Sequence, residues 1–288
     1  LAFLAEDLDH LPVIPDAVVL AGLQLGRKAE VLRLFLGGDP DVDHGARHAL
    51  AVSNATVALH LACLALGIGP GYEVIAPSLS FVATTNAVLY TGATVRFAEI
   101  NGPEDLTISP RAIERLINPR TRAIVVMHYG GYPCQMPEIM AIARQYDLKV
   151  IGDAAHSPGA SLQDISLGTW GDIGCFSFFS NKNLSTGEGG MIVTDDDALA
   201  EQFHLLRSHG MTSLTWDRHQ GHAWSYDVVA EGYNYRIDEI RSALGREQLR
   251  KLPANNARRR ELTALYRDLL AEFCPQISVP FQNHPGVS

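Results

Sequence analysis

Short runs rich in β-branched residues alternate with amphipathic segments from about residue 48 onward, and this alternation most constrains the fold. It is typical of βα units around a mostly parallel sheet. The runs expected to form strands cover residues 73–77, 94–100, 123–128, 149–154, 174–179 and 190–195. The segments expected to form helices cover residues 56–67, 80–91, 110–117, 135–146 and 197–207. The sequence therefore predicts an α/β fold, a mostly parallel mixed sheet flanked by helices.

The alternation stops near residue 236, which indicates a domain boundary. Residues 238–273 have the pattern of a helix, and we expect a break in it near Pro253 because proline lacks an amide hydrogen. We therefore expect a poorly defined N-terminal segment at 1–45, a large α/β domain at 46–237 and the start of a small helical domain at 238–288. Because the chain begins with Leu1 and stops just after a proline-rich stretch, we expect it to be a fragment with an incomplete small domain.

Composition argues against nucleic acid as a partner. The chain has 288 residues, 47% of them hydrophobic, and 23 Lys and Arg stand against 32 Asp and Glu, a net charge of -9. The densest basic run is 258–260, which is typical of a solvated helix face. We expect an ordinary globular protein that binds small molecules.

The cysteines and the apolar stretches argue against metal sites, disulfides and membranes. Four widely separated cysteines form no C-x-x-C pair, so neither a zinc site nor a disulfide framework is indicated. The apolar stretches are all shorter than the roughly 20 residues that a membrane span needs, and the start lacks the basic region of a signal peptide. We expect a soluble, cytoplasmic protein.

The string GDAAHSPGA at 152–160 places Asp153 at the carboxyl end of an expected strand. Ligands of open α/β sheets bind at this end of the strands, so the carboxylate is a candidate site residue. An equally good interpretation from position alone is that Asp153 caps the turn that follows.

The string GCFSFFSNKNLSTGEGG at 174–190 contains Lys182 between an aromatic strand and a glycine-rich turn. A single lysine is usually a surface charge, but glycines let the backbone pass close to a ligand, which favours a functional lysine here. Ser177, Ser180 and Asn183 are small polar residues suited to receive a phosphate.

The string AVSNATVALHLACLALG at 51–67 is a polar turn that runs into an amphipathic helix. The free amides at a helix start, with the hydroxyls of Ser53 and Thr56, would form an anion cradle. Because Ser and Thr also cap ordinary helices, a purely structural role is the alternative. A lysine, a carboxylate and a phosphate cradle are together what an enzyme needs to hold pyridoxal phosphate (PLP).

Five strings resemble, in order and spacing, the DegT/StrS family of fold-type I PLP-dependent sugar aminotransferases. They are SNAT-x-ALHLA, IGPGYEVIAPSLSFVATTNAV, GDAAHSPGA, FSFFSNKNLSTGEGG and GYNYRIDEIRSALG, and the resemblance covers about residues 45–272. It implies that Lys182 is the Schiff-base lysine and that Asp153 pairs with the pyridine nitrogen. The other cofactor-binding positions implied are His156 beside the ring oxygen, Phe81 on the ring face, and Ala55, Thr56 and Ser177 around the phosphate.

In the string GYNYR, Asn234 and Arg236 match residues that reach across a dimer interface into the neighbouring subunit's site. The resemblance thus implies a homodimer with shared active sites. The string is equally typical of a turn that leads into a helix capped by Asp238, and the two interpretations are compatible.

The resemblance implies transfer of an amino group from an amino acid, glutamate or glutamine, to a keto-sugar, nucleotide-linked or a cyclitol ketone, in amino-sugar biosynthesis for a polysaccharide or an antibiotic. Lys182 would serve as anchor and as proton carrier. Some members are dehydratases with His at that position, so Lys182 favours transamination. The alternatives are a PLP-dependent lyase on the same fold and a truncated or regulatory PLP-binding protein without turnover.

Overall fold

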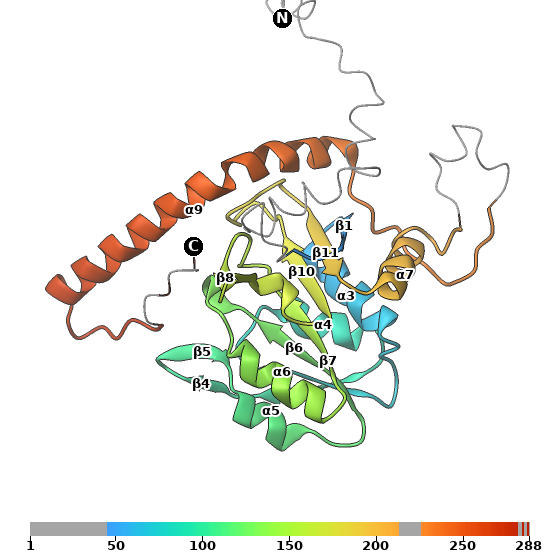
Figure 1. The fold of residues 1–288 in the computed structure, drawn as a ribbon, viewed down its shortest axis with the longest axis horizontal. Coiled ribbons are helices and arrows are strands. Elements are labelled where there is room, and N and C mark those ends of the chain that lie inside the picture. The colour runs from blue at the N-terminus through green and yellow to red at the C-terminus, as the bar shows by residue number, and fades with distance from the viewer. Residues whose placement is uncertain (1–44, 213–225, 282–283, 285–286, 288) are drawn as a thin grey trace, which may run out of the picture.

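The computed structural model describes residues 45–212, 226–281, 284 and 287 (Figure 1). The N-terminal segment expected at 1–45 therefore lies, except for residue 45, outside the described residues. At the centre is a seven-stranded sheet in the order β1-β11-β10-β7-β6-β2-β3. Its strands are β1 (His48–Val52), β2 (Glu73–Pro77), β3 (Thr94–Ala98), β6 (Thr121–Met127), β7 (Lys149–Asp153), β10 (Ile173–Ser177) and β11 (Gly190–Thr194).

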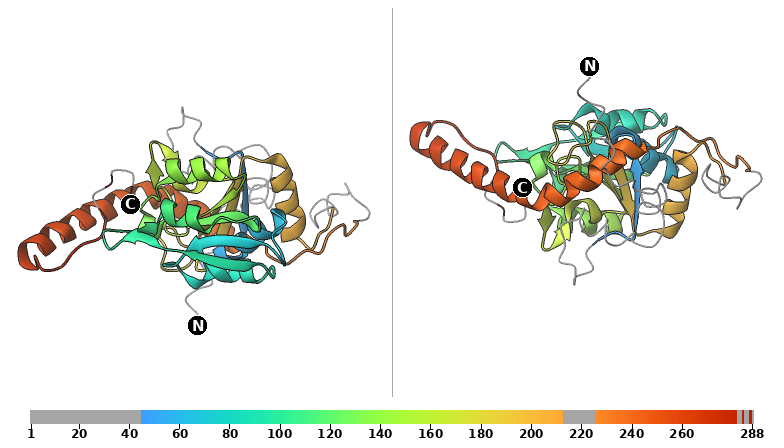
Figure 2. Two further views of the ribbon diagram at one scale, coloured as in Figure 1. Left: turned by 90° about the horizontal axis from the view of Figure 1, so that it is seen from below. Right: turned by 90° about the horizontal axis from the view of Figure 1, so that it is seen from above.

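The sheet is parallel from β10 to β3, and β11 runs antiparallel to both of its neighbours. The prediction of a mostly parallel mixed sheet is confirmed. Helices cover both faces (Figures 1 and 2). They are α3 (Ala55–Ala65), α4 (Val82–Leu89), α5 (Pro110–Leu116), α6 (Met136–Gln145) and α7 (Asp197–Arg207).

Each central strand sends alternate side chains into two hydrophobic cores, as the period of two in a strand requires. Val150 packs with α5 and α6 on one face, and its neighbour Ile151 packs with α3, α4 and α7 on the other. Both side chains are fully buried. A one-residue slip would reverse the two faces, so this pattern fixes the register that aligns the strand ends.

Several short elements were not expected from the sequence. Strand β1 lies in a run of alanine and leucine that carries little strand signal, and its pairing with β11 holds it in place. The expected strand 94–100 ends at Ala98, and Ile100 begins a separate hairpin. The remaining short elements are β4 (Ile100–Gly102), β5 (Asp105–Ile108), β8 (Ser161–Leu162), β9 (Ile165–Ser166), η1 (Tyr129–Gly131) and η2 (Leu167–Thr169).

The long helix α9 (Glu239–Phe273) passes through Pro253 without interruption, so the expected break is wrong. Proline in a helix interior costs about 3 kcal/mol because it removes one hydrogen bond and crowds the preceding turn. Leu249 and Leu252 are buried against β10 and β11 on one side of the proline, and Asn256 is buried on the other. These contacts hold both halves in line, and the ribbon bows gently (Figure 1).

The four cysteines have free thiols, and burial raises the pKa of Cys63 to about 12. Within the part of the chain that the structure describes, every helix is too short or too polar to cross a membrane.

Candidate functional site

The candidate residues gather at the carboxyl edge of the parallel strands. Asp153 is the last residue of β7 and lies opposite Cys175 of β10. Two residues further along β10, Ser177 lies opposite Gly190, the first residue of β11. The sheet register therefore brings the GDAAHSPGA and FSFFSNKN strings to adjoining strand ends.

Asp153 is a buried carboxylate, 3% exposed, that receives two hydrogen bonds. The Thr84 hydroxyl donates to Oδ2 at 2.7 Å, and the Ala155 amide donates to Oδ1 at 3.2 Å. Burial raises the pKa of Asp153, while these two donors and the positive charge of Lys182 oppose that rise. The Ala155 contact is the turn cap considered from the sequence, so Asp153 caps the turn while its carboxylate lies at the site.

Lys182 lies on the loop after β10 and is half-buried. Its amide donates to the Phe179 carbonyl at 2.9 Å, which closes a tight turn. Burial lowers the pKa of Lys182, and the negative charge of Asp153 opposes this. A lysine with a lowered pKa is more often neutral, which is the form that attacks a carbonyl or accepts a proton.

The polar turn expected before residue 56 leads directly into α3, which begins one residue earlier, at Ala55. Asn54 is the cap residue, and its side chain accepts from the Val57 amide at 3.0 Å. The first amides of a helix lack partners within it, so those of Ala55 and Thr56 are suited to an anion. A Cβ built on Gly190 would lie 2.8 Å from the Ala55 nitrogen, so only glycine lets β11 approach this turn.

His156 and Phe81 lie on the loops beside Asp153 and α4. Burial and then the charge of Lys182 lower the pKa of His156 to about 4. The Gly130 amide donates to Nδ1 of His156 at 3.2 Å, so the neutral ring carries its proton on Nε2. Phe81 precedes α4 and is 65% exposed, which leaves its ring available to a ligand.

One suggested phosphate ligand has a different role. The side-chain amide of Asn183 donates to the Pro158 carbonyl at 2.9 Å and to Oδ1 of Asn256 at 3.2 Å. Asn256, buried in α9, donates to the same carbonyl at 3.0 Å. The pair therefore ties the Lys182 loop to the loop after Asp153, and Asn183 is not placed to bind phosphate.

Sequence reasoning missed Asn256 and Thr84. Nothing local to Asn256 signals a contact with a loop 98 residues away. Thr84 had a visible signal, because it stands four residues after Ser80 in the string LSFVATT, a spacing that would place the two on one face of the helix expected at 80–91.

The model of the DegT/DnrJ/EryC1/StrS aminotransferase family matches residues 43–287. The chain belongs to this family. The predicted family, an aminotransferase family with PLP as its cofactor, is thereby confirmed.

Two curated relatives are similar to most of this chain. The spore coat polysaccharide biosynthesis protein SpsC of Bacillus subtilis is 41% identical over 84% of this chain and 62% of its own. GDP-perosamine synthase of Caulobacter vibrioides is 41% identical over 82% of this chain and 61% of its own. The chain spans about three fifths of the length of these curated relatives.

The fold is also that of solved family members. The structure of Helicobacter pylori PseC, an aminotransferase involved in the biosynthesis of pseudoaminic acid, superimposes with a TM-score of 0.74. It is 33% identical, and the match covers 88% of this chain and 65% of PseC. The fold class expected from the resemblance is confirmed.

Asn234 and Arg236 lie on a segment held against its own chain. The Tyr235 carbonyl accepts from the Ser53 amide at 2.9 Å, and the Tyr235 amide donates to the Arg207 carbonyl at 3.1 Å. The side chains of Asn234 and Arg236 are exposed. As the alternative interpretation holds, the segment leads into α9, where Asp238 accepts from the Arg241 amide at 2.9 Å.

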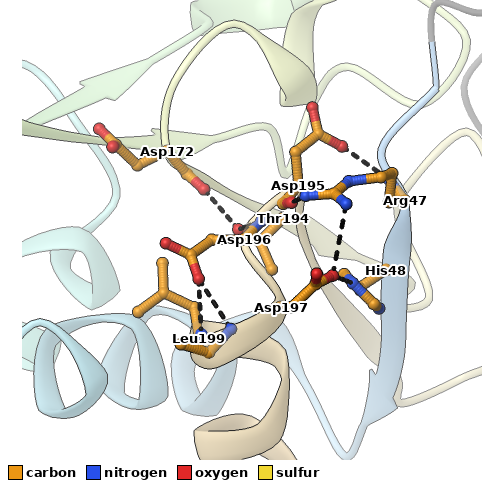
Figure 3. A network of polar contacts seen from close by, with 9 residues as sticks. Arg47, His48, Asp172, Thr194, Asp195, Asp196, Asp197 and Leu199 are labelled. Atoms are coloured by element: carbon orange, nitrogen blue, oxygen red, sulfur yellow. Dashed lines mark hydrogen bonds and ion pairs between the residues drawn. The ribbon is translucent and has the colours of Figure 1, made fainter.

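A second polar cluster lies where β11 ends, at the end of the sheet opposite to the candidate site (Figure 3). The Arg47 amide donates to Asp195 at 2.7 Å, and Nε2 of His48 lies 2.6 Å from Asp197. A hollow of about 520 Å³ here is lined by Arg47, Asp172 and residues 195–198. Because protein cations and amides pair with these carboxylates, the cluster fastens β1 to the start of α7 and lies away from the candidate site.

Proposed function

We propose that the chain is the PLP-binding part of an aminotransferase that moves an amino group from glutamate or glutamine to a nucleotide-linked keto-sugar. Residues 46–237 would form the large PLP-binding domain, and residues 238–288 would begin the small one. The observation that carries the proposal is that the buried Asp153 at the end of β7 lies within the electrostatic influence of Lys182, on the loop after the adjoining strand β10. The sugar chemistry named for the relatives SpsC, GDP-perosamine synthase and PseC supports the substrate class.

The residues present fit PLP in kind and in position. The lysine amine matches the aldehyde of the cofactor, and the buried carboxylate matches the ring nitrogen. The start of α3, which β11 can approach only because residue 190 is glycine, matches the phosphate. When bound, PLP supplies an electron-accepting ring that stabilises negative charge on the carbon next to the transferred nitrogen.

Lys182 has two tasks in this proposal. Its Nζ would hold the cofactor covalently, and as a free amine Nζ would carry the proton from the α-carbon of the amino donor. Its lowered pKa suits both tasks, because the neutral amine is the reactive form.

Asp153 and His156 orient the ring. The Asp153 carboxylate would accept the hydrogen of the ring nitrogen, and its charge would keep that nitrogen protonated. Nε2–H of His156 would donate to the ring oxygen, since Nδ1 already accepts from the Gly130 amide. Phe81 would stack on the ring face, and Ala55, Thr56 and Ser177 would bind the phosphate.

The site is proposed to be completed by a second copy of the chain, with Asn234 and Arg236 reaching into the partner's cradle. Mixing inactive Lys182→Ala chains with inactive Arg236→Ala chains tests this. In the mixed dimer one site regains both residues, so up to about a quarter of wild-type activity is expected from random pairing. Mixtures that stay inactive although mixed dimers form would contradict a shared site.

The activity test supplies PLP, then glutamate or glutamine, and then a panel of nucleotide-linked keto-sugars. Wild type should form the keto acid and the aminated sugar in equal amounts. Lys182→Ala should abolish both products, whereas Lys251→Ala, an exposed lysine on α9, should change neither. Keto acid and ammonia without an amino acceptor would identify a lyase, and PLP binding without product would identify a binding protein. Either result would overturn the proposal.

A further inference from the structure

Thr84 of α4 donates a hydrogen bond to one carboxylate oxygen of Asp153, and the backbone just after Asp153 donates to the other. The Thr84 side chain is buried, with the residue 1% exposed, and its hydroxyl donates to Oδ2 of Asp153 at 2.7 Å. The Ala155 amide binds the other oxygen at 3.2 Å. One donor on each oxygen fixes the plane of the carboxylate and leaves its remaining lone pairs for a ligand.

The Ser80 hydroxyl lies next to the Thr84 hydroxyl. Oγ of Ser80 lies 2.6 Å from Oγ1 of Thr84 and 3.1 Å from the sulfur of Met127. Ser80 lies just before Phe81, the cap residue of α4, and Thr84 lies in the first turn of the helix, where the two hydroxyls meet. The two hydroxyls therefore form a chain from Met127 to Asp153.

The direction of this chain depends on the charge of Asp153. A carboxylate only accepts, so Thr84 gives its single hydrogen to Asp153. Ser80 then has two acceptors in reach, Oγ1 of Thr84 and the sulfur of Met127, and the hydroxyl oxygen is the stronger acceptor. If Asp153 were protonated and donated to Thr84, Thr84 would donate to Ser80, and Ser80 would be left with the Met127 sulfur as its acceptor. Sulfur is a weak acceptor, so the reversed chain ends on a poor partner. The arrangement favours the ionised form of Asp153.

We propose that Thr84, supported by Ser80, is a positioning residue that orients Asp153 and keeps it ionised toward the PLP ring nitrogen. This rests on the role proposed above for Asp153. Burial alone would favour the neutral acid, which could not hold the ring nitrogen in its protonated form. Phe81 lies between Ser80 and Thr84 in sequence, so one helix start supplies both the ring-face contact and the support for Asp153.

The test replaces Thr84 with valine, which keeps the shape and removes the hydroxyl, and with serine, which keeps the hydroxyl. Thr85→Val is the matched control, because the Thr85 hydroxyl only donates to the Val82 carbonyl on the outer side of α4. Thr84→Val should weaken PLP binding by about tenfold, the loss expected for a hydrogen bond to a buried charge. Thr84→Ser should stay within about threefold of wild type, and Thr85→Val should be unchanged.

A second readout needs no cofactor. Carboxyl carbon NMR of aspartate-labelled protein without PLP follows the Asp153 titration, and Asp153→Asn assigns its signal. The midpoint should rise by about one pH unit in Thr84→Val, as expected for the loss of a donor to the charged form, and should return toward wild type in Thr84→Ser. A folded Thr84→Val protein with the wild-type midpoint, or a serine variant as impaired as the valine variant, would overturn the inference. Failure of wild type to bind PLP would instead count against the proposed function, and the NMR measurement would still decide the role of Thr84.

Discussion

Gly190 of β11 lies in backbone contact with Asn54, the cap of α3, so closely that a Cβ on Gly190 would come 2.5 Å from the Asn54 carbonyl carbon. The contact is with backbone, which cannot rotate away as a side chain can. The tight approach sets the position of the α3 amides relative to Ser177.

Gly190→Ala should therefore push β11 away from α3. We expect the free energy of unfolding to fall by about 1–3 kcal/mol, as for other overpacked sites, and PLP binding to weaken in the folded protein. Gly69→Ala is the control, because its nearest contact would be an ordinary 3.7 Å. Urea denaturation and PLP titration of both variants check this, and equal behaviour of the two would contradict it.

Asn256 should matter for stability although it lies on a distant helix. Asn256→Ala removes one of the two donors to the buried Pro158 carbonyl and the acceptor for the half-buried Asn183 side chain. We expect a loss of about 1–3 kcal/mol in the free energy of unfolding. The neighbouring Asn255 is exposed, so Asn255→Ala should be close to neutral. Thermal or urea unfolding measures the difference, and similar losses in both variants would refute the role given to Asn256.

His128 should make stability depend on pH. It is fully buried, its Nε2 donates to the Leu167 carbonyl at 2.9 Å, and burial lowers its pKa to about 4. Below about pH 6.5 His128 is protonated in the unfolded chain but stays neutral in the folded protein. Stability therefore falls as the pH drops from about 6.5 to about 4. The contribution is roughly 2–3 kcal/mol over that range.

His128→Gln isolates this effect, because glutamine can still donate to Leu167 but does not titrate. Urea unfolding at pH 6.5, 5.5 and 4.5 should show a steeper decline for wild type than for the variant. Asp153, whose pKa burial raises, acts with the opposite sign in both proteins and cancels in the comparison. Parallel declines would show that His128 does not cause the pH dependence.

Phe81 should affect PLP binding without affecting stability. Its side chain is 65% exposed, so Phe81→Ala removes little buried area, and the free energy of unfolding should change by less than about 0.5 kcal/mol. Loss of the ring contact should weaken PLP binding by about tenfold. Phe97→Ala, another exposed aromatic at 58%, is the control and should leave binding unchanged. Unaltered PLP affinity in Phe81→Ala would remove Phe81 from the site.

The sequence predicted those parts of the fold that depend on local pattern. Strand β2 and helix α7 have the expected bounds, because each is an apolar run or an amphipathic segment between clear breaks. The helix break expected at Pro253 is absent. Proline does weaken a helix locally, but tertiary contacts on both sides of it outweigh that cost. Strand β1 was missed because its pairing partner is about 140 residues away.

For the candidate site, the sequence identified residues that touch a ligand better than residues that support them. Asp153 ends strand β7 and Lys182 follows the adjoining strand β10, so the characteristic strings that contain them lie at neighbouring strand ends. Thr84 and Asn256 act through contacts over 69 and 98 residues of sequence. No local pattern shows such contacts, and Asn183 was misjudged because its partner Asn256 was not visible from the sequence.

The central claim is that Lys182 holds PLP covalently. Borohydride reduction of the PLP-loaded protein fixes the cofactor to the lysine that carries it, and peptide mass spectrometry locates it. The account predicts one reduced pyridoxyl group per chain, on the peptide that contains Lys182, and none in Lys182→Ala. Modification mainly at Lys149 or Lys251, or equal labelling of the Lys182→Ala variant, would contradict it.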